Sequence, residues 1–354
     1  MFLLESLLVT LVKLVDSIPI PAPPTGGRGR PPVYPDRLFL KAFVIMMVWR
    51  LQKVDEFLAV LAAPTPEMYS LRGPLTDPQG RVPSRWTWVR RLAAVLATLP
   101  VQIGSLGRHQ GALFQPWTDD ARAAAIDSPV LRALDGVWHT KDREDGGVPH
   151  TSIDPEAHWT TSIWYIWIYN WKLHLVCTAG RVWMPLAAER TPANAADNLQ
   201  APGLCQKFPM ELRFLLGDHH DRGPDLEQLC TRRGCLVMTP TGGVCPHTDD
   251  GVEVRRILRK THSIAIENFH EQFKGIFEGH SQVPTRGLVA TRRFALGAIF
   301  VYQLALRYRH DIGADLRVGP KPLSAPPDNE DQASPRQPAS IPHIQRRQGK
   351  GRAT

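Results

Sequence analysis

The sequence predicts an α/β domain with a mixed sheet flanked by helices, preceded by an all-helical region. From residue 128 onward, short apolar runs rich in β-branched and aromatic residues first form three successive strands and then alternate with helical segments. Residues 38–112 instead carry apolar side chains at helical spacing. Hydrophobic residues make up 43% of the 354 residues and charged residues 21%, which is the composition of a folded chain with a sizeable core.

The first 36 residues contain a short apolar segment and a linker. Residues 1–18 carry leucine and valine at helical spacing, interrupted by Glu5, Lys13 and Asp16. We expect neither a signal peptide nor a membrane span, because there is no basic leader and no run of ~18 uncharged apolar residues. We predict an amphipathic helix packed on the body of the protein, with binding to a membrane surface as the alternative. Proline and glycine dominate residues 19–36, which we interpret as a linker.

Residues 37–112 form the predicted helical region, and their basic side chains suggest a nucleic-acid partner. Ser84 follows a proline and is a good N-cap, because its hydroxyl accepts from a free amide of the first helical turn. The helix that it opens carries Arg85, Arg90 and Arg91. Short basic helical units commonly dock on DNA, and the net charge of +8 permits such a partner. The alternative is a helical bundle whose arginines are solvated.

The α/β domain is predicted over residues 128–310. Its expected strands are residues 131–137, 163–177, 181–187, 212–216 and 235–239, and its expected helices are residues 193–199 and 257–277. Three early strands followed by alternating helix and strand indicate a mixed sheet covered by helices. Residues 319–354 hold seven prolines, six Lys or Arg and no aromatic side chain, so we predict a disordered basic tail.

Three acidic residues occur at positions typical of a catalytic centre. Asp135 follows the apolar run LRAL, Asp218 follows LRFLLG, and Glu267 lies in the long helix. The carboxyl ends of strands face the crevice in which open α/β sheets bind ligands, and carboxylates buried there need a partner. Mg²⁺ and Mn²⁺ prefer such hard oxygen ligands, and a pair of these ions promotes phosphoryl transfer. The alternative is that each aspartate belongs to an ordinary turn.

Basic side chains accompany two of these elements. Glu267 and Lys274 are seven residues apart, so they lie ~20° apart around the helix. At the edge of the apolar face, Glu267 would reach a metal while Lys274 reaches a phosphate. Lys172 and His174 alternate with Leu173 and therefore share one face of a strand. That face either contacts DNA or is solvated.

Five motifs occur in an order that resembles a known family. They are ALDG around Asp135, YNWKLHL at residues 169–175, TPANAADN at residues 191–198, LLGD ending at Asp218, and the pair Glu267 and Lys274. The intervals between the three acidic residues are 83 and 49 residues. In these features the chain resembles bacterial insertion-sequence transposases of the DDE type, which have a ribonuclease-H-like catalytic domain. The resemblance extends from about Gly29 to Arg309.

The resemblance implies a reaction, a cofactor and partners. Asp135, Asp218 and Glu267 would ligate Mg²⁺, with Mn²⁺ as a substitute, and Lys274 would position the DNA backbone. Metal-bound water would cut the phosphodiester at an element end, and the freed 3′-OH would then attack target DNA. The partners would be double-stranded DNA of the terminal inverted repeats and of the target, and further copies of this chain assembled on that DNA. We expect a cytoplasmic, nucleoid-associated protein without a membrane partner.

Three positions depart from the family pattern. Ser263 stands where the family usually has arginine, Asp221 where it has tyrosine, and Asn170 where it has glycine. These departures leave two alternatives open: a catalytically decayed DNA-binding relic or repressor of the element, and a related ribonuclease-H-like nuclease. Arg28 and Arg30 flank a glycine in a string that resembles an AT-hook core, so this segment is either a minor-groove arm or a basic linker.

Cysteine and histidine clusters suggest other sites less strongly. The five cysteines are odd in number and widely spread, which indicates a reducing compartment rather than a disulfide framework. The series Cys230, Cys235, Cys245 and His247 has looser spacing than a usual structural zinc site. We interpret the His/Asp-rich segment after Asp218 as a polar loop.

Overall fold

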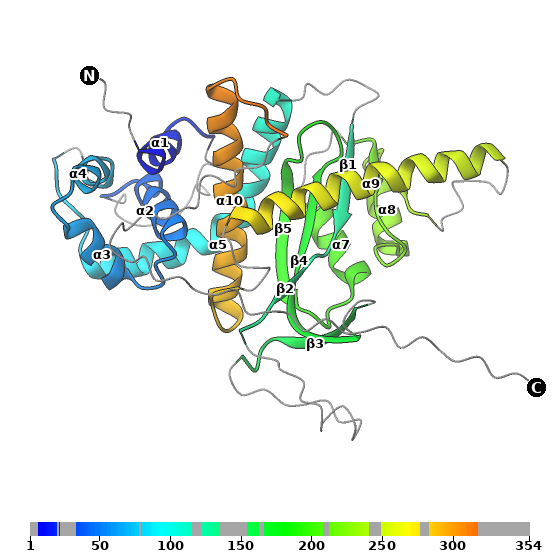
Figure 1. Cartoon of the computed structure of the whole chain (residues 1–354), viewed down its shortest axis with the longest axis horizontal. Coiled ribbons are helices and arrows are strands. Elements are labelled where there is room, and N and C mark those ends of the chain that lie inside the picture. The colour runs from blue at the N-terminus through cyan, green and yellow to red at the C-terminus, as the bar shows by residue number, and fades with distance from the viewer. Residues whose placement is uncertain are drawn as a thin grey trace, which may run out of the picture. The chain divides into compact units, whose positions relative to one another are not determined.

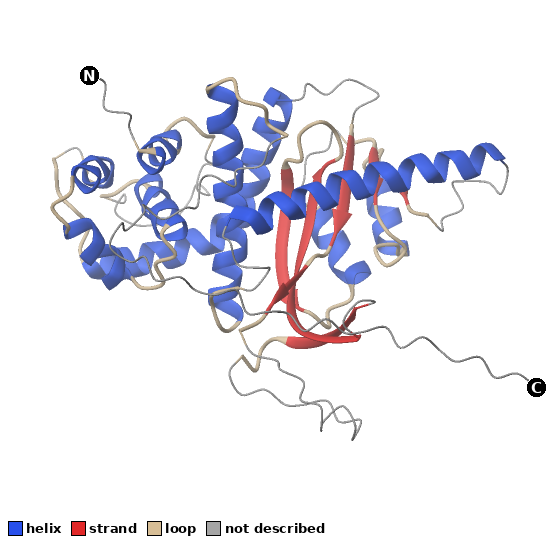
Figure 2. Cartoon of the chain, viewed as in Figure 1, coloured by secondary structure: helices blue, strands red, loops and turns tan. Residues whose placement is uncertain are grey.

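In the part of the chain that the structure describes, seven strands form one mixed sheet, and the long strand β4 pairs with four of the others (Figures 1 and 2). The computed structural model describes residues 6–19, 21, 33–77, 79–114, 122–134, 154–162, 166–207, 212–240, 249–276 and 283–317. The strands are β1 (Ala123–Asp127), β2 (Val130–Arg132), β3 (His158–Ser162), β4 (Ile166–Thr178), β5 (Pro185–Pro192), β6 (Phe214–Leu216) and β7 (Leu236–Met238). An α/β architecture with a mixed sheet was expected and is confirmed.

The sheet combines antiparallel and parallel pairing. The strands β1, β2, β3 and β5 all pair with β4 in antiparallel fashion, whereas β6 runs parallel to both of its neighbours, β1 and β7. Ala124 pairs with Thr178 and Val130 with Lys172, so β1 and β2 keep one register along β4. They are therefore a single run that is interrupted at Ser128, and Leu173 N donates to the Pro129 carbonyl at 2.9 Å to hold that break in register.

The alternation of side chains along β4 separates two apolar clusters on the two faces of the sheet. Trp171, Leu173 and Leu175 belong to the larger cluster, whereas Val176 belongs to the smaller one. On β1, Ala125 joins the larger cluster and Ile126 the smaller. Because successive side chains of a strand point to opposite faces, the apolar residues of β4 contribute to both clusters. The strand is therefore buried on both faces, which agrees with its run of aromatic and β-branched residues.

Helices cover both faces of the sheet and build the N-terminal part (Figure 2). They are α1 (Leu7–Leu14), α2 (Asp36–Val48), α3 (Val54–Ala62), α4 (Pro66–Arg72), the short 3₁₀ turn η1 (Gly73–Leu75), α5 (Arg85–Phe114), α7 (Asp197–Cys205), α8 (Pro224–Arg232), α9 (Asp249–Ile276) and α10 (Leu288–Asp311). The helices α5, α9 and α10 pack toward the larger cluster, and α7 and α8 toward the smaller. Figure 1 shows α9 crossing the sheet obliquely over β1.

The N-terminal helices share their core with the α/β part. The helix α10 packs against α1, α2, α5 and β5, and each of these elements contributes side chains to the larger cluster. The approach is close: a Cβ at Gly107 of α5 would lie 2.1 Å from the Pro185 carbonyl oxygen of β5. The described part of residues 37–112 is helical, as expected, and its core is continuous with that of the α/β part rather than separate from it.

Two sequence-based expectations about the N-terminal part are met in the described residues. Ser84 caps α5, because Thr87 N donates to its hydroxyl at 3.3 Å. The helix α1 packs on the body through Leu8, Val9, Leu11 and Val12. The Pro/Gly segment expected as a linker lies largely outside the described residues, as does the expected C-terminal tail.

Several expected boundaries are corrected. The strand expected to lead to Asp135 is β2, which ends at Arg132. The strand expected from Arg181 begins at Pro185, because the Thr178 hydroxyl accepts from Met184 N at 2.9 Å and closes a turn in between. The helix expected from residue 193 begins at Asp197, where an acidic side chain favours the first turn. The helix expected from residue 257 begins at Asp249.

Two of these helices have the length and composition of membrane spans. These are α5 and α10, and 44% and 72% of their most apolar windows are buried inside the protein. Core helices have the same composition, so this observation is weak evidence for a membrane. The sequence-based expectation of no membrane partner stays a prediction.

Candidate functional site

The register between β1 and β6 brings two aspartates together. Ala125 pairs with Leu216 in parallel fashion, so Asp127 and Asp218 lie two residues further along neighbouring strands, at the same edge of the sheet. Neighbouring strands are about 4.8 Å apart. Asp127 alternates with Ile126, which faces the smaller cluster, so the Asp127 side chain faces the α9 side of the sheet. Asp127 and Asp218 are therefore neighbours at the carboxyl ends of parallel strands, close enough for the charge of Asp218 to act on Asp127.

The Asp127 carboxyl group is held in an electrostatically unfavourable position. Burial raises its pKa above the ordinary value, although the Ser128 backbone amide and His262 act in the opposite direction. The nearby carboxylates of Asp218 and Asp197 raise the pKa of Asp127 further. Negative charge is thus concentrated at this edge of the sheet, which is the arrangement that binds a cation.

The loop after β6 is closed by a reciprocal pair of hydrogen bonds. Asp218 N donates to Asp221 Oδ2 at 2.9 Å, and Asp221 N donates to Asp218 Oδ1 at 3.2 Å. Asp221 is buried, and a Cβ at Gly217 would lie 3.1 Å from both Asp221 and Ile126. Burial and the Asp218 charge raise the pKa of Asp221 to about 8. The departure at Asp221 therefore has a structural role, because this side chain fixes the position of Asp218.

The helix α9 is anchored across β1 at two points. His262 Nε2 donates to the Ile126 carbonyl oxygen at 2.9 Å, and His270 Nε2 lies 3.8 Å from Asp127 Oδ2. Glu267 is four residues after Ser263 and three before His270, so the three side chains occupy one side of the helix. Ser263 lines the same pocket as Asp218, and His270 reaches Asp127. Glu267 is exposed and lies on the stripe of α9 that borders both aspartates.

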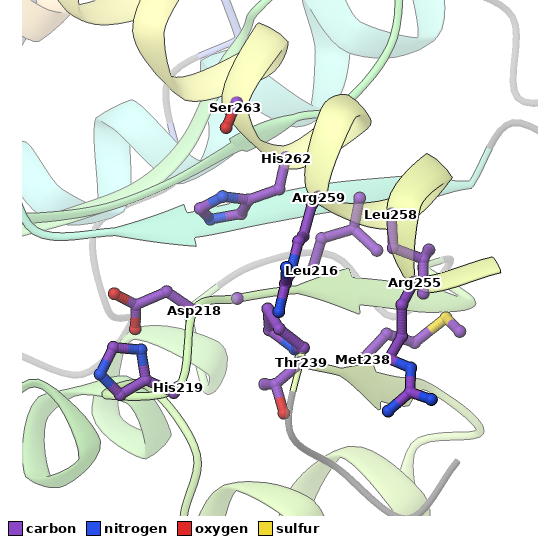
Figure 3. Close-up of a pocket in the computed structure, with 12 residues that line it drawn as sticks. Leu216, Asp218, His219, Met238, Thr239, Arg255, Leu258, Arg259, His262 and Ser263 are labelled. Atoms are coloured by element: carbon purple, nitrogen blue, oxygen red, sulfur yellow. The ribbon is translucent and has the colours of Figure 1, made fainter. Parts of the chain in front are cut away.

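A pocket opens beside Asp218 (Figure 3). Its volume is about 340 Å³, and it lies between the β6 loop, the end of β7 and α9. Asp218 and His219 form one wall, and Arg255, Arg259 and His262 of α9 form another. One wall therefore carries carboxylate and the opposite wall carries guanidinium groups.

Lys172 and His174 support the site from the other face of the sheet. The Lys172 ammonium group bonds the Asp197 carboxylate at 3.0 Å. His174 is buried, with its ring nitrogens 2.6 Å from the Ser128 hydroxyl and 2.7 Å from the Thr191 hydroxyl. Thr191 donates its own proton to a backbone carbonyl, so it accepts from His174 Nε2, and Ser128 donates to Nδ1. His174 therefore bridges β5 to the residue after Asp127.

The expected DNA contact by His174 is corrected by this burial, and its strand face is not solvated either. Lys172 is largely buried in its ion pair with Asp197. The pKa of His174 falls to about 4, chiefly because burial disfavours the charged ring. Lys172 therefore pairs with Asp197 within the protein, and His174 contacts Ser128, the residue after Asp127.

The remaining predicted residues are distributed as follows. Asp135, Arg28 and Arg30 lie outside the described residues. Lys274 belongs to α9, but its side chain is outside the described part. On the N-terminal helices, Arg85 pairs with Asp55, Arg91 pairs with Asp36, and Arg90 is exposed. Of the expected acidic triad, the structure therefore describes two members. Asp218 lines the pocket, and Glu267 lies on α9 one turn after Ser263, which lines the same pocket.

Asp127 is the site residue that sequence reasoning missed. It ends the apolar run AAAI, as Asp218 ends LRFLLG, so the same signal was present. The sequence-based prediction placed the first carboxylate at Asp135, which follows the next apolar run, LRAL. The choice between them depends on the register with β4 and β6, which no local pattern reveals.

The donor set at this edge fits a hard divalent cation. The half-buried Asp127 carboxylate lies near the carboxylates of Asp218 and Asp197, whose like charges a cation would neutralise. Ligand atoms of Asp218, His219 and His220 also lie within 4.8 Å of one another. His219 and His220 are exposed, whereas Asp127 and Asp218 are half-buried, so this second group is the weaker candidate.

A cluster of thiols lies away from this site. Cys205, Cys230 and Cys235 are buried between α7, α8 and β7, and the Cys230 thiol is hydrogen bonded to both of the others. Sequence reasoning included Cys230 and Cys235 but missed Cys205. The other two members of the suggested zinc series, Cys245 and His247, lie outside the described residues.

No family model matches the chain, and neither a curated protein nor a solved structure is significantly similar to it. Function is therefore inferred from the geometry of this site together with the motif resemblance.

Proposed function

We propose that this chain is a DDE-type DNA transposase with a ribonuclease-H-like catalytic domain, which binds the inverted repeats of its own element and cuts and joins DNA. The observation that carries the proposal is the position of Asp127 beside Asp218 at the carboxyl ends of the parallel strands β1 and β6. The helix that carries Glu267 crosses over this pair. Three carboxylates from two strands and one helix are the set that the resemblance implies.

The fold supports the proposal at a coarser level. The antiparallel strands come first in the chain, and helix and strand then alternate to add β6 and β7 in parallel. This order is the one expected for a ribonuclease-H-like domain. It also brings the chain back so that α9 lies over the first strand.

The catalytic residues in this proposal are Asp127, Asp218 and Glu267, with Asp127 in the role that the sequence alone assigned to Asp135. The three carboxylates would hold Mg²⁺, or Mn²⁺ in its place. The ion would lower the pKa of water and neutralise charge on the phosphodiester. The chain itself presents the carboxylates in fixed positions: His262 anchors α9 to β1, and Asp221 fixes the loop that carries Asp218.

The surrounding residues would bind and orient DNA. Arg90 is exposed on α5 and provides positive charge in the N-terminal helical region. Lys274 belongs to α9 and provides positive charge in the α/β part. Two DNA ends must be joined in one reaction, so we propose that several copies assemble on DNA. A cytoplasmic, nucleoid-associated location follows from the same proposal.

A strand-nicking assay tests the proposal and separates Asp127 from Asp135. The substrate is a labelled duplex that contains the DNA bordering the gene, with Mg²⁺ or Mn²⁺. Wild-type protein should produce discrete 3′-OH ends, Asp127→Asn and Glu267→Gln should produce none, and Asp135→Asn should cut like wild type. Equal activity of wild type and Asp127→Asn would contradict the site. Tight binding without cutting by wild type would instead favour the decayed relic.

A further inference from the structure

Two arginines of α9 form a wall of the pocket beside Asp218. Arg255 and Arg259 are four residues apart, so they lie on one side of the helix and about 6 Å apart along its axis. Figure 3 shows the Arg259 side chain extending from α9 toward Leu216 and Thr239, which lie at the ends of β6 and β7. Their charge thus faces the pocket rather than the opposite side of the helix.

The Arg259 guanidinium group is available to a ligand. Within the residues that the structure describes, Arg259 makes no hydrogen bond or ion pair. By contrast, the neighbouring Arg256 is paired with Glu253 at 2.6 Å and does not line the pocket. Two cations one helical turn apart, in a pocket open to solvent, favour a ligand with negative charges at regular intervals.

We infer that Arg255 and Arg259 bind two nearby backbone phosphates of the DNA strand whose scissile linkage is presented to Asp127 and Asp218. This assignment rests on the proposed function and adds a substrate subsite to it. The pocket begins at Asp218 and ends at the arginines, so the strand runs along α9 from the carboxylates toward the N-terminal half of that helix.

The helix fixes how far this subsite is from the cut. Arg259 and Arg255 precede Glu267 by eight and twelve residues, which is ~12 Å and ~18 Å along the axis. With the ~3.4 Å rise per nucleotide of one strand in a duplex, the contacted linkages are roughly three to five nucleotides from the scissile linkage. The carboxylates alone set the reacting phosphate, and the arginines set the register of the strand.

A chemical cycle between one side chain and one phosphate tests the inference. The substrate is the duplex used in the nicking assay, with a neutral methylphosphonate at one linkage at a time. Binding is measured by fluorescence anisotropy for wild type, Arg259→Gln and the matched control Arg256→Gln. Wild type should lose about tenfold in affinity when the contacted linkage is neutral. Arg259→Gln should bind the unmodified duplex about tenfold more weakly than wild type does. Neutralising the contacted linkage should then cause no further loss of affinity in this variant.

The salt dependence gives a second readout. The slope of log affinity against log salt should fall by about 0.9 for Arg259→Gln on a duplex. Arg256→Gln should retain the full sensitivity to the neutral linkage. If no single linkage couples to Arg259, or if Arg256→Gln abolishes the same coupling, the subsite is wrong. If wild type still cuts the duplex and Asp127→Asn does not, the proposed function stands without the subsite. If wild type neither binds nor cuts the duplex, both the subsite and the proposed function are wrong.

Discussion

Replacing His174 by glutamine should make the stability of the protein less sensitive to acid. The His174 ring is buried and joins the Ser128 and Thr191 hydroxyls, and the pKa of His174 is lowered from 6.5 to about 4. The glutamine side chain that replaces it has no titrating group. Comparing the pH dependence of stability between wild type and His174→Gln therefore isolates the protonation of His174.

The sign and size follow from proton linkage. Between pH 6.5 and about 4 the unfolded chain has protonated His174 while the folded chain has not, so acid favours unfolding. One pKa unit corresponds to about 1.36 kcal/mol. Lowering the pH from 7.5 to 4.5 should therefore remove about 3 kcal/mol of stability from wild type through His174, and none from the variant.

Urea unfolding followed by tryptophan fluorescence measures this difference. At pH 7.5 the His174→Gln variant should be less stable than wild type by about 1–3 kcal/mol, because at least one buried hydroxyl loses its partner. The gap should shrink as the pH falls and vanish or reverse near pH 4.5. The exposed His109, replaced by glutamine, is the matched control for the loss of a histidine. A gap between His174→Gln and wild type that stays constant from pH 7.5 to 4.5 would refute the buried neutral ring.

Three further outcomes follow from the structure. In EDTA at pH 8, Asp127→Asn should raise the free energy of unfolding by about 1–3 kcal/mol, because it removes a charge that Asp218 and Asp197 repel. Asp135→Asn should not, and a urea titration compares them. Mn²⁺ should raise the Tm of wild type in a thermal melt and leave that of Asp127→Asn unchanged. Gly107→Ala should destabilise the fold by about 2–4 kcal/mol in the same melt, because its Cβ would collide with the Pro185 carbonyl. Gly203→Ala, a helix position with no atom within 4 Å of the new Cβ, should be neutral or stabilising.

The parts of the fold with strong local patterns could be predicted from the sequence. The run that became β4 was found because it is rich in aromatic and β-branched residues, and α9 was found because its apolar side chains recur at helical spacing. Asp218 was found because it directly follows a short buried strand. The ends of α9 and β5 were misplaced, and for β5 the reason is a side-chain hydrogen bond of Thr178 that decides where the preceding turn closes.

The first carboxylate could not be chosen from local pattern. Asp127 and Asp135 each follow an apolar run of similar character. Only the pairing of β1 with both β4 and β6 distinguishes them, and strand register is a contact between distant parts of the chain. In the sequence, the pair Ser128–Pro129 also resembles a loop between elements, although here the same extended run continues into β2.

The departures from the family pattern have to be judged by what each side chain contacts. In the sequence, Asp221 is an additional negative charge beside Asp218, the proposed catalytic aspartate, which suggests a weakened site. In the structure its carboxylate accepts from Asp218 N and its own amide donates back, so removing it would release the loop that holds Asp218. Ser263 leaves room in a pocket whose cationic wall is supplied from one and two turns earlier, by Arg259 and Arg255. Both departures are therefore compatible with a working centre, because the neighbouring residues supply the loop closure and the positive charge.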